Sequence, residues 1–206
     1  NPAEMPFENT IKRMFVIVKN MHLDAMIALE TRNRSLCGDV IARDNDVDRL
    51  HWLIARQTNI ILKNASLARK MGVSTSKVVN TYIISRIIER IGDHAVRISE
   101  NAQRMPENRV DPEVLAAIKK ASTLALSIFD KSIISFFNGD MEGSHKNIEK
   151  VEKLEEICEN INVLAMKKDP FIAVSLRYIA ESVRRSGEYA GDISESVINY
   201  LVEEKA

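Results

Sequence analysis

The chain has 206 residues, of which 45% are hydrophobic, and its 29 Lys and Arg residues balance its 29 Asp and Glu residues. This length and apolar content suffice for one domain with a sizeable core or for two small domains. The lack of a net positive charge argues against direct nucleic-acid binding by this chain. No apolar run approaches the roughly 20 residues of a membrane-spanning helix, and no signal peptide opens the chain. We therefore expect a cytoplasmic protein without a transmembrane segment.

Helical periodicity dominates the sequence, and no alternating strand pattern is evident. Only seven glycines and five prolines interrupt it, so we expect long helices joined by short turns. Gly72 is suited to end the second helix, and Ser74 or Thr75 to cap the third. The expected helices span residues 6–32, 36–71, 75–105, 112–137, 141–167 and 171–203.

An internal repeat relates the two halves of the chain. A shift of 95 aligns RIGDHAVRISE (90–100) with RSGEYAGDISE (185–195), where Arg, Gly, Ala, Ile, Ser and Glu coincide. A shift of 104 aligns VDRLHWL (47–53) with VEKLEEI (151–157). We therefore predict an all-α fold of six long helices, arranged as two tandem three-helix bundles with antiparallel neighbours. The two units would comprise residues 1–106 and 107–206.

Two pairs of carboxylates lie in neighbouring helices of the first unit. Asp44 and Asp48 are four residues apart in the second helix, and Glu89 and Asp93 are four apart in the third. Each pair therefore shares one helical face. Four carboxylates brought together repel one another unless a cation or bound protons offset their charge. Oxygen ligands suit magnesium, manganese or calcium, and carboxylate sites in helical bundles also hold iron.

Ion pairing on a solvated helix face is the commoner explanation of such carboxylate pairs, and Arg49, Arg86 and Arg90 are available as partners. Gly92 lies within the third helix, where glycine costs about 1 kcal/mol relative to alanine. Close helix packing explains this glycine most simply, and a backbone contact with a ligand is the alternative. His94 follows the last acid by one residue, about 100° around the helix, which makes it a doubtful ligand.

Other signals of chemistry are weak. His22, His51 and His145 are isolated and are expected to be ordinary surface or core residues, and Trp52 a core or interface anchor. No Gly-rich phosphate loop, nucleophile elbow or Ser–His–Asp order is present. The two cysteines, at positions 37 and 158, have no zinc-binding spacing. We expect them to be buried reduced thiols, with a disulfide as the alternative.

The segment YIISRIIERIGDHAVRISENA (82–102) resembles the signature helix of the PhoU family, in which ERIGDHA or ERIADHA precedes IAE. The family's E(D)-x-x-x-D motif matches Glu89 and Asp93 and is similar to Asp44 and Asp48. Its duplicated three-helix architecture covers residues 8–203. The chain looks most like archaeal members, in which a small DNA-binding domain can precede the PhoU-like region. A sequence that begins at Asn1 is consistent with a fragment of such a protein.

This resemblance implies a regulator of phosphate uptake and phosphate-responsive signalling, and not an enzyme. Its partners would be components of the phosphate transporter or a signalling protein. The resemblance also implies a metal, of divalent or iron type, and the ligands carried over by position are Asp44, Asp48, Glu89 and Asp93. We further expect a homodimer. Two alternatives stay open: a structural or dimerisation module of a larger transcription regulator, and a carboxylate-bridged metalloenzyme. The latter normally needs Glu-x-x-His pairs, which this chain lacks in register.

The second unit departs from this motif. Arg184 and Glu188 stand at the places of the acids in the third helix, and Ile148 and Glu152 at the places of those in the second. An arginine at a ligand position repels a metal cation. We therefore expect one intact acidic site, in the first unit, and an Arg184–Glu188 ion pair that replaces the metal in the second.

Overall fold

The computed structural model describes residues 7–105 and 110–203, which form seven α-helices and no strand. The all-α fold predicted from the sequence is confirmed, with six long helices and one short one. The first unit contains α1 (Phe7–Thr31), α2 (Arg34–Leu62), the short α3 (Ala65–Met71) and α4 (Thr75–Arg104). The second unit contains α5 (Pro112–Asn138), α6 (Met141–Ala165) and α7 (Pro170–Glu203).

The prediction of a single helix over residues 36–71 is wrong, because the chain breaks between α2 and α3 at Lys63 and Asn64. The Asn64 amide donates to the Ile61 carbonyl at 3.0 Å and closes the last turn of α2. The Asn64 carbonyl accepts a hydrogen bond from the Ala68 amide and so starts α3. Asparagine favours such terminal positions because its side chain competes for backbone hydrogen bonds within a helix. The other predicted helices agree with the structure to within two residues at each end.

Short polar residues and one left-handed glycine set the turns between the long helices. Ser74 is the N-cap of α4, as predicted, and accepts a hydrogen bond from the Lys77 amide at 3.1 Å. Gly139, with φ of +63°, ends α5, and Asp140 immediately begins α6. Because the turns are this short, successive long helices run antiparallel.

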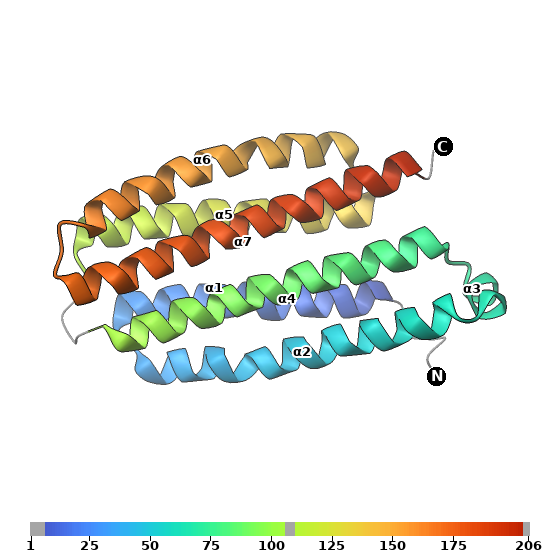
Figure 1. Ribbon diagram of the computed structural model, residues 1–206, viewed down its shortest axis with the longest axis horizontal. Coiled ribbons are helices and arrows are strands. Elements are labelled where there is room, and N and C mark those ends of the chain that lie inside the picture. Colours follow the sequence, from blue (N-terminus) through green and yellow to red (C-terminus); the bar gives the residue numbers. More distant parts are fainter. Residues whose placement is uncertain (1–6, 106–109, 204–206) are drawn as a thin grey trace.

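Figure 1 shows the two units as two groups of helices, with α4 and α7 side by side between them. Within each unit, every long helix packs on the other two, and the contact between α4 and α7 is the most extensive in the molecule. A smaller contact joins α1 to α5. Over residues 7–105 and 110–203, no helix combines the length and the hydrophobicity needed to cross a membrane.

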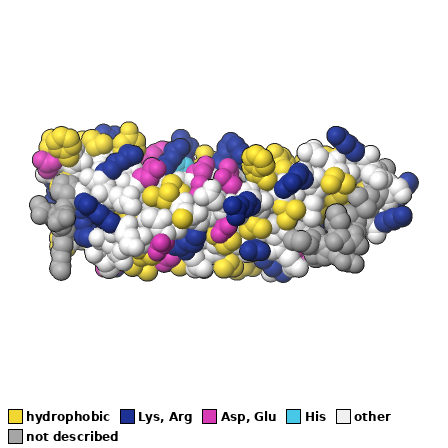
Figure 2. Space-filling view, turned by 90° about the horizontal axis from the view of Figure 1, so that it is seen from below, with side chains coloured by type: hydrophobic (Ala, Val, Ile, Leu, Met, Phe, Trp, Pro, Cys, Tyr) yellow, Lys and Arg dark blue, Asp and Glu magenta, His cyan; other side chains and the backbone are white. Residues whose placement is uncertain are grey.

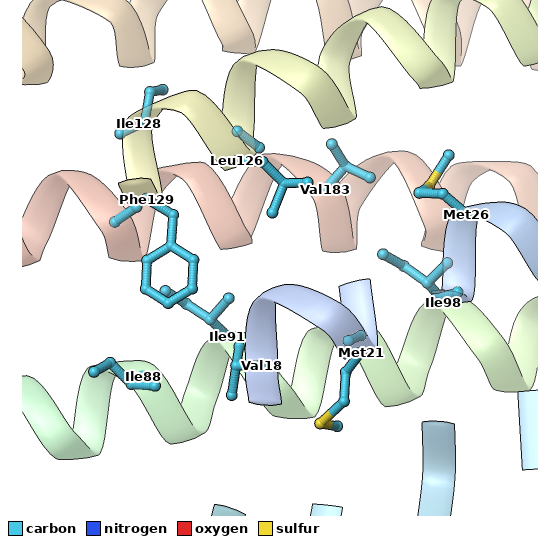
Figure 3. Packing of buried hydrophobic residues seen from close by; sticks show 14 of the residues in the cluster. Val18, Met21, Met26, Ile88, Ile91, Ile98, Leu126, Ile128, Phe129 and Val183 are labelled. Carbon is cyan, nitrogen blue, oxygen red and sulfur yellow. The ribbon is translucent and has the colours of Figure 1, made fainter. Parts of the chain in front are cut away.

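A single hydrophobic core runs through both units. Phe129 of α5 packs edge-on against Phe15 of α1, with ring centroids 4.9 Å apart. Figure 3 shows the Phe129 side chain pointing toward Ile91 of α4, so residues of the second unit fill space in the first. The proposed boundary at residues 106 and 107 lies outside the described residues, and the division into two domains stays a prediction.

Both cysteines are buried and free, which confirms the expectation of reduced thiols. Burial raises the pKa of the Cys158 thiol to about 12, and it also raises that of Cys37. The two thiols therefore stay protonated near neutral pH and pack as small apolar side chains.

The burial pattern shows which residues of the two units are equivalent. A shift of 107 takes the buried Val47 and His51 of α2 to the buried Leu154 and Cys158 of α6, and it also matches the first residues of the two helices. The predicted shift of 104 for this pair is therefore wrong by three residues. A three-residue slip rotates a helix by only about 60°, so the apolar stripe still looks nearly in phase. The predicted shift of 95 between α4 and α7 is confirmed by their buried positions.

That shift pairs Gly92 with Gly187, but the two glycines differ in how tightly they are packed. A Cβ atom at Gly187 would lie 2.0 Å from Cδ2 of the buried Leu154. At Gly92 the nearest atom is Cγ2 of Val18, at 3.4 Å, an ordinary contact distance. The close approach of α6 to α7 therefore requires glycine, whereas α4 has room for a methyl group.

Alanine substitutions should separate these two sites. Gly92→Ala is expected to raise the free energy of unfolding by up to about 1 kcal/mol, because alanine favours the helix. Gly187→Ala makes the same gain but forces Leu154 to move in a packed core, at a cost of about 1–3 kcal/mol. Urea unfolding of the two variants beside the parent protein measures the difference. Equal stability of the two variants would contradict this account of the α6–α7 contact.

Candidate functional site

The contact between α2 and α4 places the four predicted acidic side chains near enough for their charges to act on one another. Asp44 Oδ1 lies 3.6 Å from the position that a Cβ at Gly92 would take, so the side of α2 that carries Asp44 directly contacts α4. The negative charge of Asp48 acts on Asp44, Glu89 and Asp93. All four acids are partly buried. Figure 2, seen from below α2, shows acidic side chains gathered along the middle of this face.

Burial and mutual repulsion raise the pKa values of three of these carboxyl groups. The pKa of Asp44 rises from 3.8 to about 6, first through desolvation and then through the charges of Asp48 and Asp93. The pKa of Glu89 is raised mainly by desolvation and then by the charge of Asp93. The pKa of Asp93 is likewise raised mainly by desolvation and then by the charge of Asp48. The ionised cluster therefore destabilises the folded protein, and a bound cation or bound protons would remove this destabilisation.

The arginines expected to pair with these acids neutralise only part of the cluster. Arg86 Nη1 lies 3.3 Å from Glu89 Oε1. Arg49 instead pairs with Asp46, 3.7 Å away on the exposed side of α2. Arg90 lies over an aromatic ring of α7, and its charge, with those of Arg97 and Arg86, partly offsets the rise in the pKa of Asp93. Among the described residues, a direct ion pair with an arginine therefore accounts for one of the four acids.

Two oxygen atoms of the cluster, Asp44 Oδ1 and Glu89 Oε2, are buried and have no hydrogen-bond partner among residues 7–105 and 110–203. Buried carboxylate oxygens without a partner are costly, and oxygen donors of this kind suit magnesium, manganese, calcium or iron. The donor set therefore fits a hard metal cation. Within the described residues, however, no three Asp, Glu, His or Cys side chains are close enough together to hold an ion. Metal binding here would require the carboxylates to rotate toward a common centre.

The histidines beside the cluster make other contacts. His94 packs on Tyr189 of α7 at a centroid distance of 5.7 Å, on a different side of α4 from the acids. The buried His51 forms a hydrogen bond with Ser85 Oγ at 3.0 Å and stacks on Tyr82. It lies about one turn beyond the second acid of α2, Asp48, whose charge acts on it. Sequence reasoning missed this contact, because nothing in the spacing of the histidine identifies its partner in another helix.

At the equivalent place in the second unit, an arginine lies among carboxylates. Arg184 Nη2 donates to Glu181 at 2.8 Å, and its Nη1 pairs with Glu188. The predicted Arg184–Glu188 ion pair is therefore confirmed. The carboxylate of Glu181 is the main cause that raises the pKa of Arg184, and Glu188 and Glu155 act in the same direction.

The corrected register changes the equivalents of the α2 acids. Val151 and Glu155 occupy those places, and not Ile148 and Glu152 as the sequence comparison suggested. The second unit therefore keeps two of the four carboxylates, replaces one by an aliphatic residue and replaces one by an arginine. Glu181 was also missed, although its spacing of three residues from the arginine is typical of an ion pair within a helix.

Comparison with known proteins places this architecture among related chains. The PhoU domain family matches residues 11–102 and 118–197. The phosphate-specific transport system accessory protein PhoU homolog 1 of Thermotoga maritima is 23% identical over 93% of this chain and 84% of its own length. The PhoU homolog of Burkholderia sp is 25% identical over 90% of this chain and 81% of its own length.

Two crystal structures have the same fold. The phosphate transport system regulatory protein PhoU from Streptococcus pneumoniae superposes with a TM-score of 0.79 at 16% identity, covering 94% of this chain and 92% of its own. PhoU from Pseudomonas aeruginosa superposes with a TM-score of 0.84 at 19% identity, covering 96% of each chain.

The raised pKa of Asp44 predicts how stability depends on pH. A protonated Asp44 contributes stability that is fully present below pH 3.8 and is lost as the pH rises through about 6. Asp44→Asn carries no charge and escapes this loss. With allowance for solvent screening, the metal-free variant should gain about 1 kcal/mol near pH 7 and little at pH 4.

Urea unfolding in the presence of a chelator, at both pH values, measures this gain. Asp46→Asn is the matched control, because Asp46 lies on the exposed side of α2 and pairs with Arg49. A loss of stability in Asp44→Asn at pH 7, or an equal gain in the control, would contradict the prediction.

Proposed function

Because the chain belongs to the PhoU domain family, we propose that it is a regulator of phosphate transport that acts by binding other proteins and not by catalysis. Two curated relatives are named accessory proteins of phosphate-specific transport systems, which supports this assignment. The partners would be components of the transport system or of its signalling pathway, on the cytoplasmic side. A carboxylate-bridged metalloenzyme needs Glu-x-x-His pairs on two facing helices, and this chain has a single one, Glu142 and His145, which disfavours that alternative.

Exposed aromatic side chains offer surfaces for such partners. Trp52 is 66% exposed on α2, so it is not a core residue and its other predicted role, as an interface anchor, fits. On α7, Phe171 and Tyr178 are 83% and 58% exposed. Tyr178 also lines a pocket of about 380 Å³ between α6 and α7, with Asn162 on the opposite wall. Large exposed aromatic residues of this kind are enriched at protein interfaces.

We further propose that Asp44, Asp48, Glu89 and Asp93 bind a metal ion. The single observation that carries this proposal is the pair of buried carboxylate oxygens that find no hydrogen-bond partner in the described part of the chain, within a cluster of like charges. A metal ion there would neutralise the cluster and hold α2 against α4. The metal ion would therefore have a structural or regulatory role, and the four acidic residues would supply the oxygen atoms that bind it.

Metal analysis tests the site directly. Protein purified without chelator is expected to carry a stoichiometric metal ion, which Asp93→Ala should lose, because the variant removes one of the four carboxylates. Elemental analysis and thermal unfolding with and without chelator measure the content and its effect. Asp46→Asn should keep the metal. A metal-free parent protein with unchanged folding in chelator would instead favour a purely structural module.

A cellular experiment tests the regulatory role. Affinity purification from phosphate-starved and phosphate-replete cells is expected to recover components of the phosphate transport system, and loss of the protein should change the rate of phosphate uptake. Trp52→Ala and Phe171→Ala remove exposed side chains only, so they should weaken recovery without changing the melting temperature. Unchanged uptake in cells that lack the protein would contradict the proposal.

A further inference from the structure

The two units carry opposite charges at several equivalent positions of their central helices. The shift of 95 that pairs the glycines also pairs Glu89 of α4 with Arg184 of α7 and Arg86 with Glu181, so each unit has an ion pair at these two positions with its charges exchanged. The side chains of Glu89 and Arg184 lie against the neighbouring charged helix, α2 in one unit and α6 in the other. The same backbone scaffold therefore presents a fourth carboxylate in the first unit and a guanidinium group in the second.

The guanidinium group of Arg184 is held firmly by carboxylates. Its Nε and Nη2 atoms donate to the two oxygens of Glu181 at 2.9 and 2.8 Å, and Nη1 pairs with Glu188. Arg185 adds bonds to the same two acids, at 3.2 and 3.1 Å, from the more exposed side. Glu155 of α6 is the third acid whose charge acts on Arg184.

The charge balance of the two clusters therefore differs. In the second unit, two arginines pair with carboxylates in a group of three, formed by Glu155, Glu181 and Glu188. In the first unit, as far as the structure describes it, the four carboxylates have one ion-paired arginine, Arg86, and two of their oxygens are buried without a hydrogen-bond partner. An arginine side chain stays protonated under all ordinary conditions. It cannot give up its charge to admit a metal ion.

We propose that Arg184 is a built-in cation that closes the second acidic site to metal ions, so that only the first unit takes up metal. Metal uptake by the first unit rests on the proposed function, whereas the role of Arg184 is supported by its own ion pairs. Only the pairing of α2 with α4 then depends on an external cation, whereas the pairing of α6 with α7 is stabilised by the chain itself.

A charge exchange in the first unit tests the built-in cation without any metal. The double variant Arg86→Glu, Glu89→Arg gives the first unit the arrangement of Glu181 and Arg184, and Arg86→Gln, Glu89→Gln is the matched control with the same net charge. In chelator at pH 7, the midpoint of urea unfolding should be higher for the exchange variant than for the control and for the parent protein. Chelator should no longer shift the midpoint of the exchange variant. A midpoint of the exchange variant below that of the control would overturn the inference.

The reverse exchange tests the second unit. The double variant Val151→Asp, Arg184→Glu places carboxylates at all four equivalent positions, with Glu181 as a fifth, so the amount of Mn²⁺ bound per chain should double relative to the parent protein. Equilibrium dialysis against Mn²⁺ measures it. Arg185→Gln is the control and should leave binding unchanged, because its equivalent in the first unit, Arg90, is also an arginine.

The outcomes separate the two proposals. Binding of Mn²⁺ in the parent protein that Glu188→Gln reduces would show that the second site is open, and would overturn the inference. If the parent protein binds no Mn²⁺ at all, the proposed metal function fails, and the order of the unfolding midpoints in chelator still decides the role of the guanidinium group. The same order decides it if the double variant does not fold.

Discussion

The central helices α4 and α7 are each surrounded by three others, and this crowding constrains everything else in the molecule. α4 packs on α1, α2 and α7, while α7 packs on α5, α6 and α4. Helices approach closely only where their facing side chains are small, and small residues recur at the buried positions of both helices. These include Ser85, Gly92, Ser99, Ser182, Ser186, Gly187 and Ser194. With most of their circumference buried, the two helices keep only a narrow strip for charged side chains.

Because this exposed strip is narrow, the acidic side chains of the first unit lie close to one another. Glu89 and Asp93 lie on the edge of α4 that meets α2, and Asp44 and Asp48 lie on the facing edge of α2. Water reaches the strip only partly, so repulsion between the carboxylates is stronger than it would be on an open surface. The same geometry in the second unit carries a different set of charges. Duplicated packing therefore fixes where the polar clusters lie, while the residues in them decide what each cluster can bind.

Most of this arrangement could be predicted from the sequence, because it follows from local patterns. Apolar periodicity locates the long helices, and Ser74 and Gly139 mark two of their ends. The repeat around Gly92 and Gly187 reveals the duplication, and the four-residue spacing of the acids places each pair on one face. The presence of Arg184 beside Glu188 likewise follows from spacing within one helix.

Apart from Glu181, which pairs within its own helix, the features that sequence reasoning missed depend on contacts between helices or on the local choice of backbone conformation. The register of α6 against α2 was ambiguous because a slip of three residues preserves most of an apolar stripe. The break after Lys63 reflects a competition between helix extension and capping at Asn64, which a periodic pattern does not report. The contact of His51 with Ser85 joins residues 34 positions apart, on two helices whose relative rotation was unknown.

Asp93 and His94 are consecutive in α4, yet they point to different neighbours: the acid to α2 and the imidazole to Tyr189 of α7. A helix of 30 residues moves largely as a rigid rod, because bending it would break backbone hydrogen bonds. Any displacement of α4 on its acidic side is therefore also a displacement of the surface on which the aromatic ring of the other unit rests. The two units are thus coupled through α4, and a movement of this helix in one unit also changes its contact with the other unit.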